Sequence, residues 1–125
     1  MEKSIKKVLI VDDDSRNIFA LVAVLRSKGY ECSSAINVPE ALGILEADTG
    51  IGIILMDMMM PDMDGYEAIP RIKSMARGQS LPVIAVTAQA MKGDRERCLA
   101  AGADGYIAKP VDVDALVSLL QQYIG

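Results

Sequence analysis

The chain of 125 residues contains no histidine and only two cysteines. Without histidine, a Ser-His-Asp triad, a Cys-His pair, an HExxH metal site and a phosphohistidine within this chain are all excluded. Cys32 and Cys98 lie far apart and lack CxxC spacing. The sequence therefore predicts neither a disulfide framework nor a zinc site.

Aromatic residues are also scarce, and acidic residues outnumber basic ones. Phe, Tyr and Trp make up 4% of the chain, and the formal net charge is -4. With few stacking residues and no basic stripe, no nucleic-acid partner is expected. The polar stretch 1–7 is not a signal peptide, and no later apolar run has the length of a transmembrane helix. A cytoplasmic location without membrane contact by this domain is expected.

Apolar residues are plentiful, at 51% of the chain, and they occur in two alternating patterns. Short runs without polar alternation predict strands that are buried on both faces of a parallel sheet. These runs are 8–11, 53–56 and 83–86, with weaker candidates at 31–35 and 106–108. Stretches with helical spacing lie between them, over 18–25, 38–45, 65–75, 94–102 and from 112 onward.

Alternating strands and helices imply right-handed crossovers and a sheet covered by helices on both faces. We expect one α/β domain over residues 1–125, with a flavodoxin-like, doubly wound sheet of five parallel strands in the order 2-1-3-4-5 and five helices. Gly29 is predicted to end the first helix in a left-handed conformation. Asp94 is predicted to cap the fourth helix. Pro70 fits the first turn of the third helix if that helix starts near Glu67, and a kink is the alternative.

Polar residues stand directly after four of the predicted strands. In such a sheet the carboxyl ends of the strands form the rim where ligands bind. Asp12, Asp13 and Asp14 follow the first strand, Asp57 the third, Thr87 and Ala88 end the fourth, and Lys109 and Pro110 follow the fifth. We therefore expect carboxylates, a hydroxyl and an amine to converge on one edge.

Carboxylates gathered in this way repel one another and raise each other's pKa unless a cation is present. Oxygen ligands without His or Cys suit a hard ion, and Mg²⁺ suits a site with few protein ligands. A carboxylate can also act as a nucleophile and form an aspartyl phosphate, with the metal and a lysine offsetting the charge of the transferred group.

Four stretches together resemble the response-regulator receiver domain of two-component signalling. They read VLIVDDD (8–14), LMDMMMPDMDG (55–65), VTA (86–88) and GADGYIAKP (102–110). The resemblance implies that a partner histidine kinase or histidine phosphotransfer protein donates a phosphoryl group to this domain. Phosphorylation then changes the affinity for a downstream partner. Such a domain is not a conventional turnover enzyme, although it promotes its own phosphorylation and dephosphorylation.

The resemblance also assigns roles to matching residues. Asp57 is the phosphoacceptor, and Mg²⁺, with Mn²⁺ as a substitute, is held by Asp12, Asp13, Asp57 and the Met59 carbonyl. Lys109 and the Ala88 N–H contact the phosphoryl group. Thr87 and Tyr106 form the switch, and the Lys109–Pro110 peptide is cis. Met59 and Gln89 tune dephosphorylation. Methionine cannot orient the attacking water by a strong hydrogen bond, whereas Gln89 can, so we expect autodephosphorylation to be slower than in relatives with polar side chains at both positions.

Simpler interpretations exist for several of these residues. Asp14 is expected to cap the first helix or to be solvated. Taken alone, Thr87 is an ordinary strand residue, Lys109 a solvated lysine and Tyr106 a half-buried tyrosine at a sheet edge. The methionines at 58–60 are expected to serve packing, and both cysteines to be inert.

Three other functions compete with the receiver. A haloacid-dehalogenase-like phosphohydrolase needs an Asp-x-Asp-x-Thr pattern after the first strand, and Asp12 to Arg16 lacks the Thr. In a flavodoxin-like electron carrier, three aspartates at that place would repel the flavin phosphate. A scaffold pseudo-receiver would not use Asp57. With no output domain expected after the last helix, the domain is either a single-domain regulator or part of a hybrid histidine kinase.

Overall fold

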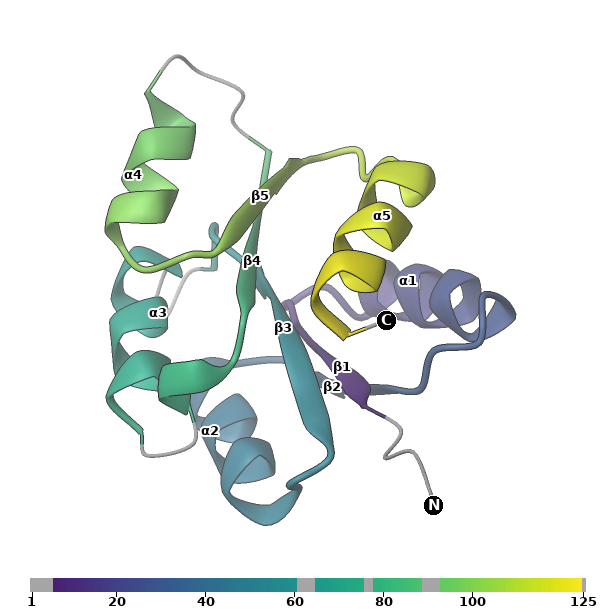
Figure 1. Cartoon of the computed structure of the whole chain (residues 1–125), viewed down its shortest axis with the longest axis horizontal. Helices are drawn as coiled ribbons and strands as arrows, with labels where there is room; N and C mark the ends of the chain where they lie inside the picture. The colour runs from purple at the N-terminus through teal and green to yellow at the C-terminus, as the bar shows by residue number, and fades with distance from the viewer. Residues whose placement is uncertain (1–5, 61–64, 76–77, 89–92, 125) are drawn as a thin grey trace.

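The computed structural model describes residues 6–60, 65–75, 78–88 and 93–124. These residues contain five parallel strands in one sheet, in the order β2-β1-β3-β4-β5, as predicted (Figure 1). The strands are β1 (Lys7–Val11), β2 (Cys32–Ala35), β3 (Ile51–Asp57), β4 (Val83–Thr87) and β5 (Gly105–Ala108).

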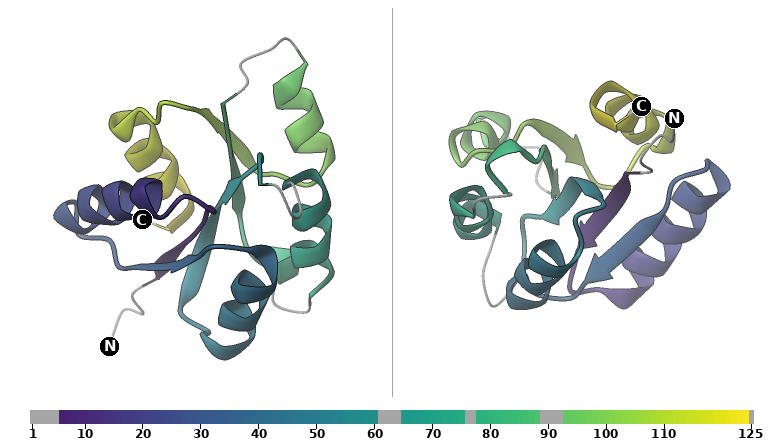
Figure 2. Two further views of the ribbon diagram at one scale, coloured as in Figure 1. Left: turned by 180° about the vertical axis from the view of Figure 1, so that it is seen from behind. Right: turned by 60° about the horizontal axis from the view of Figure 1, so that its bottom comes forward.

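Helices cover both faces of the sheet. They are α1 (Ser15–Ser27), α2 (Val38–Ala47), α3 (Gly65–Ser74), α4 (Asp94–Ala100) and α5 (Val113–Ile124), with a short 3-10 turn, η1 (Gly78–Ser80). Helices α1 and α5 lie on one face, and α2, α3 and α4 lie on the other (Figures 1 and 2). The predicted flavodoxin-like architecture is confirmed. No helix among the described residues is long and apolar enough to cross a membrane.

The strand that carries Asp57 is buried along its whole length. Every residue of β3 is buried, and successive side chains enter opposite cores. Ile54 and Met56 pack toward α2 and α3, whereas Ile53 and Leu55 pack toward α1 and α5. Burying each such side chain contributes about 1.5–3 kcal/mol relative to exposure. The two cores together hold β3 rigidly, so the position of Asp57 at its end is well defined.

Glycine and asparagine define the ends of two helices. Gly29, with φ of 91°, follows the C-cap residue of α1 in the left-handed conformation, as predicted. Asn37 caps α2, because its side-chain oxygen accepts a hydrogen bond of 2.8 Å from the Glu40 N–H.

Of the predictions about helix starts, one is confirmed and one was wrong. Helix α3 begins at Gly65, as predicted, and the Gly65 N–H donates to the Met58 carbonyl. The helix does not start near Glu67, the condition under which Pro70 would fit the first turn, so Pro70 lies inside the helix. Helix α4 is capped by Gly93, which has φ of 90°, and Asp94 is its first residue. Among the described contacts, the Asp94 carboxylate accepts hydrogen bonds from two tyrosine hydroxyls of other elements rather than from the first turn of α4.

Candidate functional site

An acidic cluster occupies the carboxyl ends of the two central strands. Val11 of β1 pairs with Met56 of β3, so the residues that follow, Asp12 and Asp57, are neighbours. Both are buried, at 4% exposure each, whereas Asp13 is exposed. One carboxylate oxygen from each of these three aspartates lies within 4.8 Å of the others. The structure thus brings together the three aspartates that the sequence placed at one site.

Main-chain N–H groups hold two of these carboxylates in place. Asp12 Oδ1 accepts a hydrogen bond of 2.9 Å from the Asp14 N–H, and Asp57 Oδ1 accepts one of 3.0 Å from the Met59 N–H. Both bonds span two residues, so each carboxylate is oriented by the turn that follows its own strand. Asp14 itself caps α1 by accepting from the Arg16 N–H, which confirms its structural interpretation.

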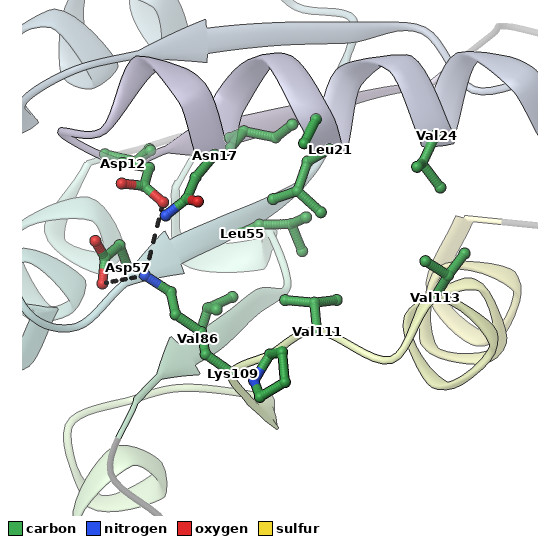
Figure 3. Close-up of a pocket in the computed structure, with 14 residues that line it drawn as sticks. Asp12, Asn17, Leu21, Val24, Leu55, Asp57, Val86, Lys109, Val111 and Val113 are labelled. Atoms are coloured by element: carbon green, nitrogen blue, oxygen red, sulfur yellow. Dashed lines mark ion pairs between the residues drawn. The ribbon is translucent and has the colours of Figure 1, made fainter.

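Lys109 supplies the positive charge of the cluster. Its Nζ lies 3.6 Å from Asp57 Oδ1 and 3.8 Å from Asp12 Oδ2 (Figure 3). The Lys109 N–H donates a 2.7 Å hydrogen bond to the Thr87 carbonyl, which ties the start of this loop to the end of β4. The Lys109–Pro110 peptide is cis, as predicted.

The electrostatic balance of this cluster remains negative, with three carboxylates and one ammonium group. Burial raises the pKa of the Asp12 carboxyl above its usual range, and the charge of Asp57 raises it further. The Asp14 N–H and Lys109 oppose this shift. A hard cation would offset the remaining charge, and the donor set, which consists of oxygen atoms with one exposed carboxylate, fits Mg²⁺.

The expected switch residues lie on the strands beside the cluster. Thr87 ends β4 and is 1% exposed, and Ala88 directly after it is exposed. Tyr106 of β5 pairs with Ala85, two residues before Thr87 on β4. Since strand side chains alternate between faces, Thr87 and Tyr106 project from the same side of the sheet. The Tyr106 ring packs against the core beneath α3 and α4.

Two of the three methionines after β3 serve packing, as expected, and the third does not. Met58 and Met60 are buried in the core, whereas Met59 is 49% exposed. Gln89 and residues 61–64, which belong to the stretch 55–65, lie outside the described residues.

A cavity of about 520 Å³ extends from the acidic cluster into the space between α1 and α5. Asp12, Asp57 and Lys109 line one end of it, and Asn17 of α1 also reaches this end (Figure 3). The remaining walls are mostly apolar, including Leu21, Val24, Leu55, Val86, Val111 and Val113. Sequence reasoning missed Asn17 and this cavity, because Asn17 stands inside a helix and follows none of the strands.

The family model for the response regulator receiver domain matches residues 8–121. The chain belongs to this family. Among curated proteins, it is 41% identical over 116 residues to the sensor histidine kinase RcsC of Salmonella typhi, covering 93% of this chain and 12% of RcsC. It is 37% identical over 120 residues to the polar-differentiation response regulator DivK of Brucella anthropi, covering 96% and 97% of the two chains. The receiver domain thus occurs in relatives of very different total length.

Solved receiver structures superimpose closely. The receiver domain of the sensor histidine kinase PA1611 from Pseudomonas aeruginosa PAO1 matches with a TM-score of 0.86 and 38% identity, covering 96% of this receiver and 98% of that chain. That structure has a magnesium ion coordinated in its active site cleft. The Ssk1 receiver domain of Saccharomyces cerevisiae, solved with the histidine phosphotransfer protein Ypd1, matches with a TM-score of 0.84 and 27% identity, covering 98% and 91%.

Proposed function

We propose that Asp57 of this receiver accepts a phosphoryl group from a phosphohistidine on a histidine kinase or a histidine phosphotransfer protein. The observation that carries the proposal is the position of Asp57. It is a buried carboxylate at the end of a rigid central strand, with two further carboxylates within 4.8 Å and Lys109 Nζ at 3.6 Å. The kinase relatives and the phosphotransfer complex of a similar receiver support the choice of donor.

In this reaction an Asp57 carboxylate oxygen forms a bond to phosphorus while the bond between phosphorus and the histidine nitrogen breaks. The histidine leaves with the electron pair of the broken bond. The Met59 N–H orients the Asp57 carboxylate, and the Lys109 ammonium group lies close enough to bind a phosphoryl oxygen. Asp12, Asp13, Asp57 and the Met59 carbonyl would hold Mg²⁺, for which Mn²⁺ is a substitute. When bound, the ion offsets the negative charge of the phosphoryl oxygens.

The same proposal assigns the residues at the end of β4 to the phosphorylated state. The Thr87 hydroxyl and the Ala88 N–H would bind phosphoryl oxygens, and Tyr106 would respond to the movement of Thr87. Because Tyr106 belongs to β5 and its hydroxyl contacts α4, a change there alters the surface that a downstream protein contacts.

Mass spectrometry tests the phosphoacceptor. Wild type and Asp57→Asn are incubated with acetyl phosphate and Mg²⁺, and wild type is also incubated with EDTA. We expect one phosphate per wild-type chain with Mg²⁺, little with EDTA and none in Asp57→Asn. A phosphate on both proteins would contradict the role of Asp57. Repeated turnover of a phosphate monoester would instead favour the haloacid-dehalogenase alternative, and no phosphate on either protein would favour the pseudo-receiver.

We also propose a cytoplasmic location, in which the domain contacts protein partners and neither nucleic acid nor membrane. Cys32 and Cys98 are both free thiols, as is usual in a reducing compartment. The relatives allow a single-domain regulator such as DivK or a receiver within a hybrid kinase such as RcsC.

A further inference from the structure

A second buried carboxylate lies outside the acidic cluster, at the start of α4. Asp94 is 3% exposed. Its Oδ1 accepts a 2.7 Å hydrogen bond from the Tyr66 hydroxyl, and its Oδ2 accepts a 3.3 Å bond from the Tyr106 hydroxyl. Tyr66 comes from α3 and Tyr106 from β5, so one carboxylate of α4 joins α4 to both elements. Figure 1 shows where these three elements lie.

This arrangement keeps both phenols protonated. Burial raises the pKa of Tyr66 and of Tyr106 above the usual value for tyrosine, and the neighbouring Asp94 carboxylate raises both further. Each phenol therefore remains a hydrogen-bond donor to higher pH than an ordinary tyrosine does. The 2.7 Å bond from Tyr66 has the length of a charge-assisted hydrogen bond, and the bond from Tyr106 is longer.

Two further contacts connect α3 with α4. The Arg97 guanidinium lies over the Tyr66 ring, 4.5 Å from its centroid, which is a cation–π distance. The Cys98 thiol donates to the Tyr66 hydroxyl at 3.9 Å. Three side chains of α4 therefore contact Tyr66. Among the described contacts, the α4 side chain that hydrogen-bonds to Tyr106 is Asp94.

Tyr106 in turn lies beside the phosphoacceptor site. It shares a sheet face with Thr87, and its own strand leads directly to Lys109. The position of the Tyr106 ring therefore affects the space into which Thr87 can move. A residue that holds the Tyr106 hydroxyl in place can therefore influence the phosphoacceptor site through the Tyr106 side chain.

We propose that Asp94 is a positioning residue that holds Tyr106 beneath α4 and so sets the coupling between the phosphoacceptor site and the α4–β5 surface. This inference rests on the proposed function of Asp57. With Asp94 in place, the ring is already packed where α4 and β5 meet. Without it, the ring must be ordered each time the site binds its phosphoryl group, which reduces the apparent affinity.

Beryllofluoride with Mg²⁺, a stable analogue of an aspartyl phosphate, is the probe. We expect Asp94→Asn to bind it about five- to tenfold more weakly than wild type, since an ionic hydrogen bond is lost. The matched control is Glu96→Gln, which removes a charge from an exposed residue in the same first turn. Its affinity is expected to be unchanged. In NMR spectra of protein with ¹³C-labelled tyrosine, the Tyr106 ring signals of Asp94→Asn should broaden or shift, and those of Glu96→Gln should not.

A double-mutant cycle with Tyr106→Phe separates positioning from general loosening of the fold. Tyr106→Phe keeps the ring and removes the hydroxyl, so it should weaken binding by a similar factor. In the Tyr106→Phe background, Asp94→Asn should then have less than about a twofold further effect. If Asp94→Asn weakens binding equally in both backgrounds, Asp94 does not act through Tyr106 and the inference is overturned.

The remaining outcomes distinguish the inference from the proposed function. A wild type that does not bind beryllofluoride, or an Asp57→Asn variant that binds it equally well, overturns the proposed function. A wild type that binds, with an Asp94→Asn variant that binds as tightly, overturns only the inference. Should Asp94→Asn fail to fold, Tyr106→Phe alone decides: an unchanged affinity overturns the inference, and a five- to tenfold loss supports it.

Discussion

The acidic cluster makes a prediction about stability that is independent of phosphorylation. Replacing Asp57 by asparagine keeps the size of the side chain and the Oδ1 atom that accepts from the Met59 N–H. It removes one of the three negative charges that lie within 4.8 Å of one another. In buffer without divalent metal, we therefore expect Asp57→Asn to be more stable than wild type.

The magnitude follows from the distances in the cluster. At an effective dielectric constant of about 20, like charges 4.8 Å apart repel by about 3.5 kcal/mol. At the same dielectric constant, opposite charges 3.6 Å apart attract by about 4.6 kcal/mol. Asp57→Asn relieves the repulsion by Asp12 and Asp13 and loses the attraction to Lys109. Because Asp13 is exposed and its charge is screened by solvent, the expected net gain is about 1–2 kcal/mol.

Thermal denaturation followed by circular dichroism measures this gain. In EDTA, the midpoint of Asp57→Asn should lie roughly 4–8 °C above that of wild type, at about 4 °C per kcal/mol for a domain of this size. Adding Mg²⁺ should stabilise wild type by about 1.4 kcal/mol at a concentration ten times its Kd, and the variant much less. The control Glu46→Gln removes one exposed charge from α2 and should change the midpoint little. An Asp57→Asn midpoint equal to or below that of wild type in EDTA would refute the electrostatic reasoning.

Three further predictions concern the lifetime of the phosphate, the alkaline limit of stability and the packing of α3. Met59→Asn should shorten the lifetime of the aspartyl phosphate several-fold, because an amide can orient the attacking water. The raised pKa of Tyr66 stabilises the fold fully below pH 10, and this contribution is lost as the pH rises above 10, since the unfolded chain ionises first. Gly65→Ala should lower the free energy of unfolding by about 1–3 kcal/mol, because an added Cβ meets the side chain and Cα of Met58. Gly43→Ala in α2, where an added Cβ meets nothing within 4 Å, should instead raise it by about 0.5–1 kcal/mol.

A separate measurement tests each of these predictions. For Met59→Asn, the loss of phosphate from the phosphorylated protein is followed over time. Equal rates in the variant and wild type would contradict the explanation of slow dephosphorylation by Met59. Urea unfolding between pH 8 and 11.5 should show a smaller loss of stability in Tyr66→Phe than in wild type, and equal slopes would contradict the shifted pKa. Chemical denaturation that ranks Gly65→Ala above Gly43→Ala would contradict the packing argument.

The sheet was predictable because its signal is local and strong. The four-residue apolar runs in β1, β3 and β4 lack polar alternation for a physical reason: cores on both faces of the sheet bury every side chain of these runs. The order of the strands was predicted from the fold class, since no pair of residues in the sequence indicates which strands are neighbours. Positions at the carboxyl ends were therefore predictable as a group, and Asp12, Asp57 and Lys109 do meet there. The cavity beside them was not, because it depends on the spacing of α1 and α5, which no local pattern encodes.

Asp94 shows where reasoning from local pattern fails. An aspartate before a helical stretch is normally read as a cap, since a capping carboxylate satisfies a free N–H of the first turn. That local gain competes with tertiary partners, and here two phenols from α3 and β5 take both carboxylate oxygens while Gly93 supplies the turn. The competition is decided by the packing of three elements, which the sequence around residue 94 does not record. A polar residue that gives up a local bond for tertiary partners ties those partners together, and the proposed coupling of α4 to the site through Tyr106 depends on these contacts.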